Sequence, residues 1–338
     1  MKNTSLFLTL IVSAALVVSC GPGKYNQETY APEESGLNVM KITDESTTSV
    51  FAPKVFSSLV GDFASSTFAG SKKERMFWAT PRLLAVSPEG DQIAFLSDVN
   101  KQRNIMTKRT ALQGAATQRT FRNVYDFSWG MDDNLYYADF TNVTDVLIAS
   151  TNAYSGSLIR QLTNNNEDYS PVLTEDGSLL FFTRVDNSGP SIWSLNLKTG
   201  ALTSCARGYS PAIVPGDNNK FLCVRNSTKG TSEIWLIDYM IGQETLILSD
   251  PSRGYSNPVL SPDGQWILCQ GNAKSNISRK MNLDIFAVKI DGTQCIQLTY
   301  HPAEDCCPAW SADGKSVYFL SARANKKNMY NVWKMRFM

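Results

Sequence analysis

The chain has 338 residues, enough for two ordinary domains or for one large all-β domain. Lysine and arginine together number 32, and aspartate and glutamate together number 31. This balance excludes the net positive field that attracts nucleic acid or an anionic membrane. It is compatible with a local basic patch. The single histidine, His301, excludes multi-histidine metal sites and permits only one Ser-His-Asp triad.

The first 20 residues have the pattern of an export signal. Lys2 precedes an apolar core over 6–18, which is short for a membrane-spanning helix of about 20 residues. The sequence V-V-S-C at 17–20 resembles the lipobox of bacterial lipoproteins, whose cysteine is lipid-modified and becomes the mature N-terminus. We therefore predict a lipoprotein signal peptide over 1–19 and lipidation of Cys20. The alternative is an ordinary secretory signal with an incidental cysteine.

Two segments precede the regular part of the chain. Residues 20–36 are rich in Gly, Pro, Asn and Glu, which predicts a flexible tether between the membrane and a single β domain over 37–338. Residues 45–80 contain six Phe or Trp residues among Ser, Gly and Ala and match no repeat. We expect this insertion to pack against the domain or across one mouth of its channel; the alternative is that it adds to the core of the first repeat.

A repeated strand pattern organises the rest of the chain. Turn signals, mostly an acidic residue followed by Gly or Asn, recur about every 41 to 50 residues and supply the positive φ angles of tight hairpins. These turns lie at 88–90, 132–133, 175–177, 216–218, 262–264 and 312–314. The apolar strands that follow them are predicted over 92–96, 135–138, 178–183, 220–224, 265–269 and 316–320. Apolar runs of this kind predict strands that are covered on both faces.

Further strands complete each unit. Third strands are predicted over 105–108, 146–150, 191–197, 233–239, 283–290 and 329–335, and fourth strands over 158–163, 202–205, 244–248 and 294–299. Four strands a unit, about six units and no amphipathic helix predict an all-β fold, a six-bladed β-propeller. The last unit lacks a fourth strand, so we expect 37–43 to pair with it and close the ring.

Six cysteines follow Cys20 in a chain predicted to be exported, where disulfides persist. Cys223 and Cys269 fall at buried strand positions, where a free thiol acts as a small apolar group. The adjacent Cys306 and Cys307 allow either a strained vicinal disulfide or two separate thiols, and geometry favours the thiols.

The pattern D-x-x-P-x-W-S-x-D-G before an apolar strand is carried best by 305–320, and in part by 84–96, 168–183 and 258–269. It resembles the propeller repeat of TolB and its relatives in Gram-negative envelopes. The resemblance implies a propeller scaffold that serves for binding. TolB carries an additional α/β domain for which 45–80 is too short, and TolB is a soluble protein that binds a peptidoglycan-associated lipoprotein.

Aromatic residues recur at the start of the innermost strands: Phe127, Tyr169, Tyr209 and Tyr255. In a propeller these positions lie near the central channel at one mouth. A partial ring of such side chains would grip a peptide or glycan through rigid apolar faces and polar tips. The alternative is that they pack between blades as part of the repeat.

His301 lies in the loop before the last unit, close to Glu304 and Asp305. It is a candidate partner contact or pH-sensitive hydrogen bonder; the alternative is an exposed loop residue without a role. The chain has no G-x-S-x-G elbow, and its acidic pairs lack calcium-loop spacing. We therefore predict a protein that is not an enzyme and that needs no cofactor or metal.

Two functions remain open. The first is a non-enzymatic, lipid-anchored scaffold of the bacterial cell envelope that binds an envelope protein or a peptidoglycan-associated partner. The second is capture of a glycan or peptide at the channel mouth, accessory to uptake or degradation machinery. In both, we expect an outer-membrane lipoprotein on the periplasmic face that contacts the membrane only through its anchor and binds no nucleic acid.

Overall fold

The computed structural model describes most of the chain from residue 34 onward. The described residues are 34, 36–43, 81–99, 102–111, 114–141, 146–157, 159–164, 167–228, 230–274, 281–323 and 330–337. Several sequence predictions lie outside them, namely the signal peptide over 1–19, Cys20, most of the tether over 20–36 and the insertion over 45–80.

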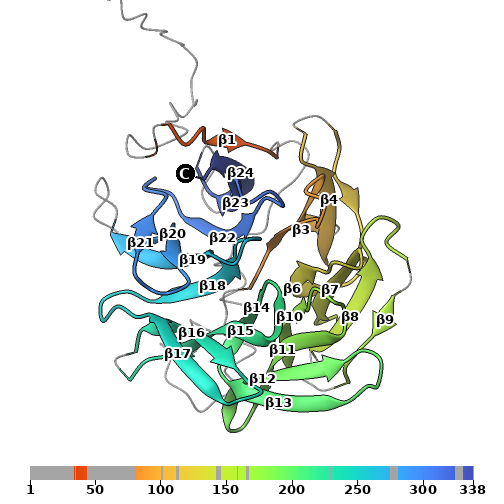
Figure 1. Cartoon of the computed structure of the whole chain (residues 1–338). Coiled ribbons are helices and arrows are strands. Elements are labelled where there is room, and N and C mark those ends of the chain that lie inside the picture. The colour runs from red at the N-terminus through yellow and green to blue at the C-terminus, as the bar shows by residue number, and fades with distance from the viewer. Residues whose placement is uncertain are drawn as a thin grey trace, which may run out of the picture.

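The described residues form six four-stranded antiparallel sheets arranged around a central axis, as a six-bladed β-propeller (Figure 1). The prediction of an all-β, six-bladed propeller is confirmed. Blades 1 to 6 are β2–β5, β6–β9, β10–β13, β14–β17, β18–β21 and β22–β24 with β1. No helix in this part of the chain is long and apolar enough to cross a membrane.

The two inner strands of each blade carry most of the core. The innermost strands are β2 (Leu84–Val86), β6 (Val124–Trp129), β10 (Asp168–Leu173), β14 (Tyr209–Val214), β18 (Tyr255–Leu260) and β22 (Asp305–Trp310). The second strands are β3 (Gln92–Val99), β7 (Asn134–Asp139), β11 (Leu179–Asp186), β15 (Asp217–Asn226), β19 (Trp266–Lys274) and β23 (Ser316–Ser321). Side chains on both faces of the second strands are buried, as Phe95 and Leu96 show, because each blade is covered by its neighbours.

The two outer strands complete each blade. The third strands are β4 (Gln102–Arg109), β8 (Leu147–Asn152), β12 (Gly189–Asn196), β16 (Ser232–Asp238), β20 (Met281–Lys289) and β24 (Asn331–Arg336). The outermost strands are β5 (Thr117–Gln118), β9 (Arg160–Gln161), β13 (Leu202–Arg207), β17 (Gln243–Leu248), β21 (Cys295–Gln297) and β1 (Met40–Lys41).

The hairpins between the first and second strands follow from the Asp-Gly signals. In blade 6, the Asp313 carboxylate accepts hydrogen bonds from the Ser311 hydroxyl (2.5 Å) and the Lys315 N–H (3.1 Å), and Gly314 has a φ of 69°. Blade 5 repeats this arrangement at its own Asp-Gly pair. The side chain fixes the turn and glycine adopts the left-handed angle without a steric cost.

Some outermost strands are shorter than the sequence predicts. The strand β5 was not anticipated, and β9 pairs over two residues where 158–163 was expected. The Thr120 and Thr163 hydroxyls accept the N–H groups of Ile105 and Ile148 at 2.8 and 2.9 Å. At these positions a threonine hydroxyl accepts the N–H group that a backbone carbonyl of the fourth strand would otherwise accept, so the pairing of the two strands ends. The spacing of apolar residues in the sequence gives no sign of this ending.

The N-terminal strand closes the ring, as predicted. β1 pairs antiparallel with β24, with Met40 opposite Lys334 and Lys41 opposite Trp333, and Figure 1 shows it at the outer edge of the last blade. The Thr43 hydroxyl donates to Asn331 Oδ1 (2.9 Å) and accepts the N–H of Val332 (2.9 Å). The two ends of the domain are thereby joined in one sheet, which closes the ring.

A buried ionic cluster reinforces this closure. Arg323 donates from Nη1 and Nη2 to the two carboxylate oxygens of Glu34 at 2.8 and 3.1 Å, and Nη2 also bonds Asp305. All three side chains are buried, and the Tyr300 N–H donates to Glu34 at 2.8 Å. Glu34 thus ties the segment before β1 to blade 6 and to the loop that enters it.

Candidate functional site

The innermost strands share an irregularity where they border the propeller axis. The pairing of β6, β10, β14, β18 and β22 with its neighbour shifts register at the same place in the strand. In four of them a non-glycine residue takes a left-handed conformation, with φ between 51° and 54°: Ser170, Ser210, Asn257 and Cys307. The left-handed conformation is uncommon for residues other than glycine. It persists where contacts with the surrounding structure hold the backbone in place.

The left-handed residues connect successive blades. The N–H of Ser170 donates to Asp126 at 3.0 Å, and the Ser170 hydroxyl donates to the same carboxylate at 2.7 Å. The N–H of Ser210 donates to the Thr183 hydroxyl at 2.9 Å. In each case the acceptor belongs to the preceding blade, so the bulged backbone is satisfied by its neighbour.

Polar groups from several blades meet at the axis, and Arg82 is central among them. Its Nη2 donates to the Pro211 carbonyl of blade 4 at 3.1 Å, so this side chain from blade 1 reaches the opposite side of the ring. The preceding carbonyl, of Pro81, accepts Asn257 Nδ2 at 3.2 Å and Cys307 Sγ at 3.5 Å. Opposed blades are therefore linked through the centre of the propeller.

The axial charges are buried. Arg82 is 8% exposed, and burial lowers its pKa, against the opposing effect of Asp126 and Cys307. Asp126 is fully buried, and burial raises its pKa to about 6 although the Ser170 hydrogen bonds and Arg82 act in the other direction. The ionised form of each group is thus costly in this environment.

The four aromatic candidates do not form one ring. Tyr169 and Tyr209 both stand directly before the register shift, but Tyr255 lies one residue earlier and Phe127 directly after it. Phe127, Tyr209 and Tyr255 are 0%, 3% and 2% exposed, and only Tyr169 is partly exposed. Sequence spacing could not show this difference, because one bulge shifts the direction in which later side chains point.

The contacts of these aromatic side chains are those of packing. Tyr169 meets Tyr125 edge-to-face with ring centres 5.1 Å apart, and Tyr255 meets Phe286 at 5.7 Å. The Tyr209 hydroxyl donates to Asn226 Oδ1 at 2.9 Å. The alternative that the aromatic positions pack within and between blades accounts for these contacts.

His301 is partly buried in the loop between β21 and β22. Its Nδ1 accepts the N–H of Ala303 at 3.0 Å, and its carbonyl accepts Asn282 Nδ2 at 3.0 Å. These bonds order the loop.

Among the described residues, no group of three or more His, Cys, Asp or Glu side chains is placed to hold a metal ion. The six described cysteines are free thiols, and Cys223 and Cys269 are fully buried, as the sequence predicted.

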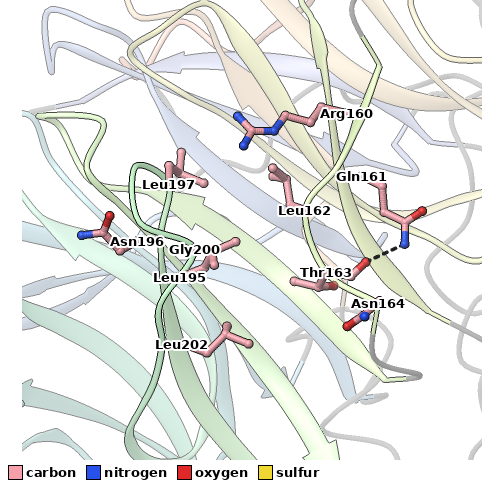
Figure 2. A pocket seen from close by; sticks show the side chains of 10 residues that line it. All are labelled: Arg160, Gln161, Leu162, Thr163, Asn164, Leu195, Asn196, Leu197, Gly200 and Leu202. Atoms are coloured by element: carbon pink, nitrogen blue, oxygen red, sulfur yellow. Dashed lines mark hydrogen bonds between the residues drawn. The ribbon is translucent and has the colours of Figure 1, made fainter.

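A cleft lies at the outer rim, between blades 2 and 3. This rim cleft has a volume of about 410 Å³ and is lined by Arg160, Gln161, Leu162, Thr163, Asn164, Leu195, Asn196, Leu197, Gly200 and Leu202. Figure 2 shows the Arg160 side chain extending over the cleft, whereas Gln161 turns away and donates to the Thr163 carbonyl at 3.0 Å. Four of the ten lining residues are leucines, which offer an apolar surface to a side chain of a partner, and the others are mostly polar.

The ring of six blades around a polar axis defines the chain as a six-bladed β-propeller. No family model and no curated protein matches the sequence. The structure is similar to a putative TolB from Agrobacterium tumefaciens (TM-score 0.58, 15% identity, covering 76% of this chain and 90% of that one).

Two further solved structures have the same fold. TolB from Acinetobacter baumannii matches with a TM-score of 0.58 and 15% identity over 78% of this chain and 67% of that one. An oligogalacturonate lyase from Vibrio parahaemolyticus matches with a TM-score of 0.55 and 10% identity over 88% and 93%. The chain therefore has a TolB-like propeller fold, which is shared by proteins with different functions.

Proposed function

We propose that this chain is a non-enzymatic, lipid-anchored propeller of the bacterial cell envelope that binds a protein partner. The lipobox-like V-V-S-C at 17–20 supports anchoring through Cys20 on the periplasmic face of the outer membrane. The lone histidine, engaged in its own loop, supports a binding rather than a catalytic role. The similarity to the TolB fold adds support for an envelope location.

The distribution of exposed apolar side chains carries this proposal. Ile159, Leu202 and Ile241 are 53%, 44% and 72% exposed, on or next to the turns between the third and fourth strands of blades 2, 3 and 4. In an antiparallel meander these turns lie on the same edge of every sheet, so the three side chains project from one side of the ring. Apolar side chains exposed on one side of a ring are candidates for a protein contact surface. The rim cleft lies between the first two of these blades.

The test is a cross-linked pull-down from envelope extracts with charged rim variants, Ile159→Asp, Leu202→Asp and Ile241→Asp. Each change should lower recovery of a specific partner by about tenfold or more, since buried apolar anchors dominate interface energies. Phe121→Asp is the matched control, because Phe121 is 68% exposed but lies between β5 and β6, at the opposite edge of the sheets. Equal recovery with all four variants, or no specific partner, would reject the proposal.

The second candidate function is capture of a glycan or peptide at the channel mouth. It is favoured by the polar axial site around Arg82, which offers a fixed cation where the sequence had suggested aromatic rings. A ligand that binds purified protein without any envelope protein would separate this function from scaffolding. Substrate turnover that required His301 would contradict both.

A further inference from the structure

We propose that the Arg82 guanidinium is the recognition group of an axial site for a ligand carboxylate. The inference rests on the second candidate function, capture at the channel mouth, and names the chemistry of the captured ligand. It is independent of partner binding at the rim.

Arg82 lacks the counter-ion that two other buried arginines, Arg184 and Arg323, possess. Arg184 forms two hydrogen bonds with the Asp168 carboxylate at 2.7 and 2.9 Å, and Arg323 binds two carboxylates. None of the ion pairs among the described residues includes Arg82, and its Nε has no hydrogen-bond partner. A buried cation without a paired anion is costly, so it is retained where an anion can be supplied.

The nearby Asp126 does not fill this role. Both of its carboxylate oxygens accept hydrogen bonds from Ser170 of blade 3, at 2.7 to 3.0 Å, and these bonds hold it between blades 2 and 3. It acts on Arg82 electrostatically but makes no ion pair with it. Its charge also opposes a second negative charge, so the site suits a monoanion better than a dianion.

The guanidinium is held in place before any ligand arrives. Nη2 is fixed on the Pro211 carbonyl, and the neighbouring Pro81 carbonyl is fixed by Asn257 and Cys307 from blades 5 and 6. Only Nη2 has a hydrogen-bond partner among the described residues. A fixed cation with unused donors loses little conformational freedom on binding, and arginine donors match the planar geometry of a carboxylate.

A carboxylate of this kind can come from the C-terminus of a peptide or from a uronic acid. Calorimetric titration of the purified chain separates the two sources with four probes: N-acetyl-trialanine as the free acid and as the amide, galacturonate, and galactose. The acid form of one pair should bind about tenfold more tightly than its neutral form, because a charge-assisted hydrogen bond is lost with the charge. Which pair shows the difference identifies the source.

Arg82→Gln should weaken acid-probe binding by about tenfold or more. Arg109→Gln, at an exposed arginine of β4 in the same blade, should leave acid-probe binding unchanged.

If Arg82→Gln does not fold, Asp126→Asn offers a second test, because it keeps the Arg82 cation and removes the negative charge that opposes the ligand. It should tighten acid-probe binding about threefold or more at about pH 7.5.

That gain should disappear near pH 5, because burial raises the pKa of Asp126 to about 6 and the wild-type carboxyl is then largely neutral. The groups that face Asp126 are Arg82, Ser170, Tyr125 and Tyr169, and Cys307 faces Arg82. Equal binding of acid and neutral probes, or unchanged binding by Arg82→Gln, would overturn the carboxylate site and leave capture in place. Absence of binding by all four probes at about 10 mM would count against both.

Discussion

Two buried arginines of this propeller, Arg323 at the ring closure and Arg82 at the axis, have opposite surroundings. For Arg323, burial acts to lower the pKa, but Asp305 and Glu34 outweigh it and the pKa is raised. For Arg82, burial prevails and the pKa is lowered. A guanidinium enclosed by carboxylates serves to hold two parts of the fold together. Arg82 keeps donors that no carboxylate of the described residues fills, and the proposed ligand carboxylate would engage them.

The largest effect that would test this difference is expected at the closure. Arg323→Met leaves Glu34 and Asp305 buried without their cation, and should lower the free energy of unfolding by about 3 to 5 kcal/mol. Guanidinium chloride unfolding measures it. Arg225→Met is the matched control, because its Glu244 partner is 45% exposed and the pair should contribute about 1 kcal/mol or less. Similar losses in both variants would remove the distinction between a buried and an exposed pair.

A second test uses the pH dependence of the closure. Burial, followed by the charge of Asp305, raises the pKa of Asp284 to about 8, and burial raises that of Asp305 to about 6. The folded state therefore binds more protons than the unfolded state between about pH 4 and pH 8, so stability should fall as the pH rises through this range.

Asp284→Asn should flatten this profile and stabilise the protein by about 1 to 3 kcal/mol at about pH 8, because the buried, ionised carboxylate is then replaced by a neutral amide. Unfolding curves at several pH values measure it. The charges that face Asp284 are Asp305, Glu34 and Arg323. A profile with the same slope in both proteins would show that Asp284 is not the group that titrates.

A smaller loss is expected where neutral groups alone join the two ends. Thr43→Val removes the hydroxyl that bonds Asn331 and Val332, and should cost about 1 to 2 kcal/mol because two buried polar groups lose their partner. Denaturant unfolding checks it. Thr110→Val, whose hydroxyl bonds a surface turn, should change stability by about 0.5 kcal/mol or less.

Among the buried contacts, the smallest change in stability is expected at the axis. Arg82→Met loses one hydrogen bond to Pro211 but also removes the cost of a buried, unpaired cation. The two contributions oppose each other, so the free energy of unfolding should change by about 1 kcal/mol or less. A loss as large as that of Arg323→Met, measured in the same way, would show that Arg82 is a structural residue.

The blades were predictable because their signals are local. Asp313 and Gly314 fix a hairpin, and the apolar run that follows packs between two neighbouring blades wherever it occurs. The same reasoning could not show that the aromatic positions differ in their place relative to the register shift. Tyr209 and Tyr255 look equivalent in the repeat, but the register shift separates them by one residue, and both are buried.

The sequence by itself determined the number of blades, the class of fold and the strand that closes the ring. Turn chemistry and the period of apolar residues act over a few residues and repeat six times. Only the tertiary structure decided where the buried charges meet. Arg82 and Pro211 are 129 positions apart, and Arg323 and Glu34 are 289 apart. A single arginine carries no periodic signal, and its role depends on which carboxylates the closed ring brings within reach.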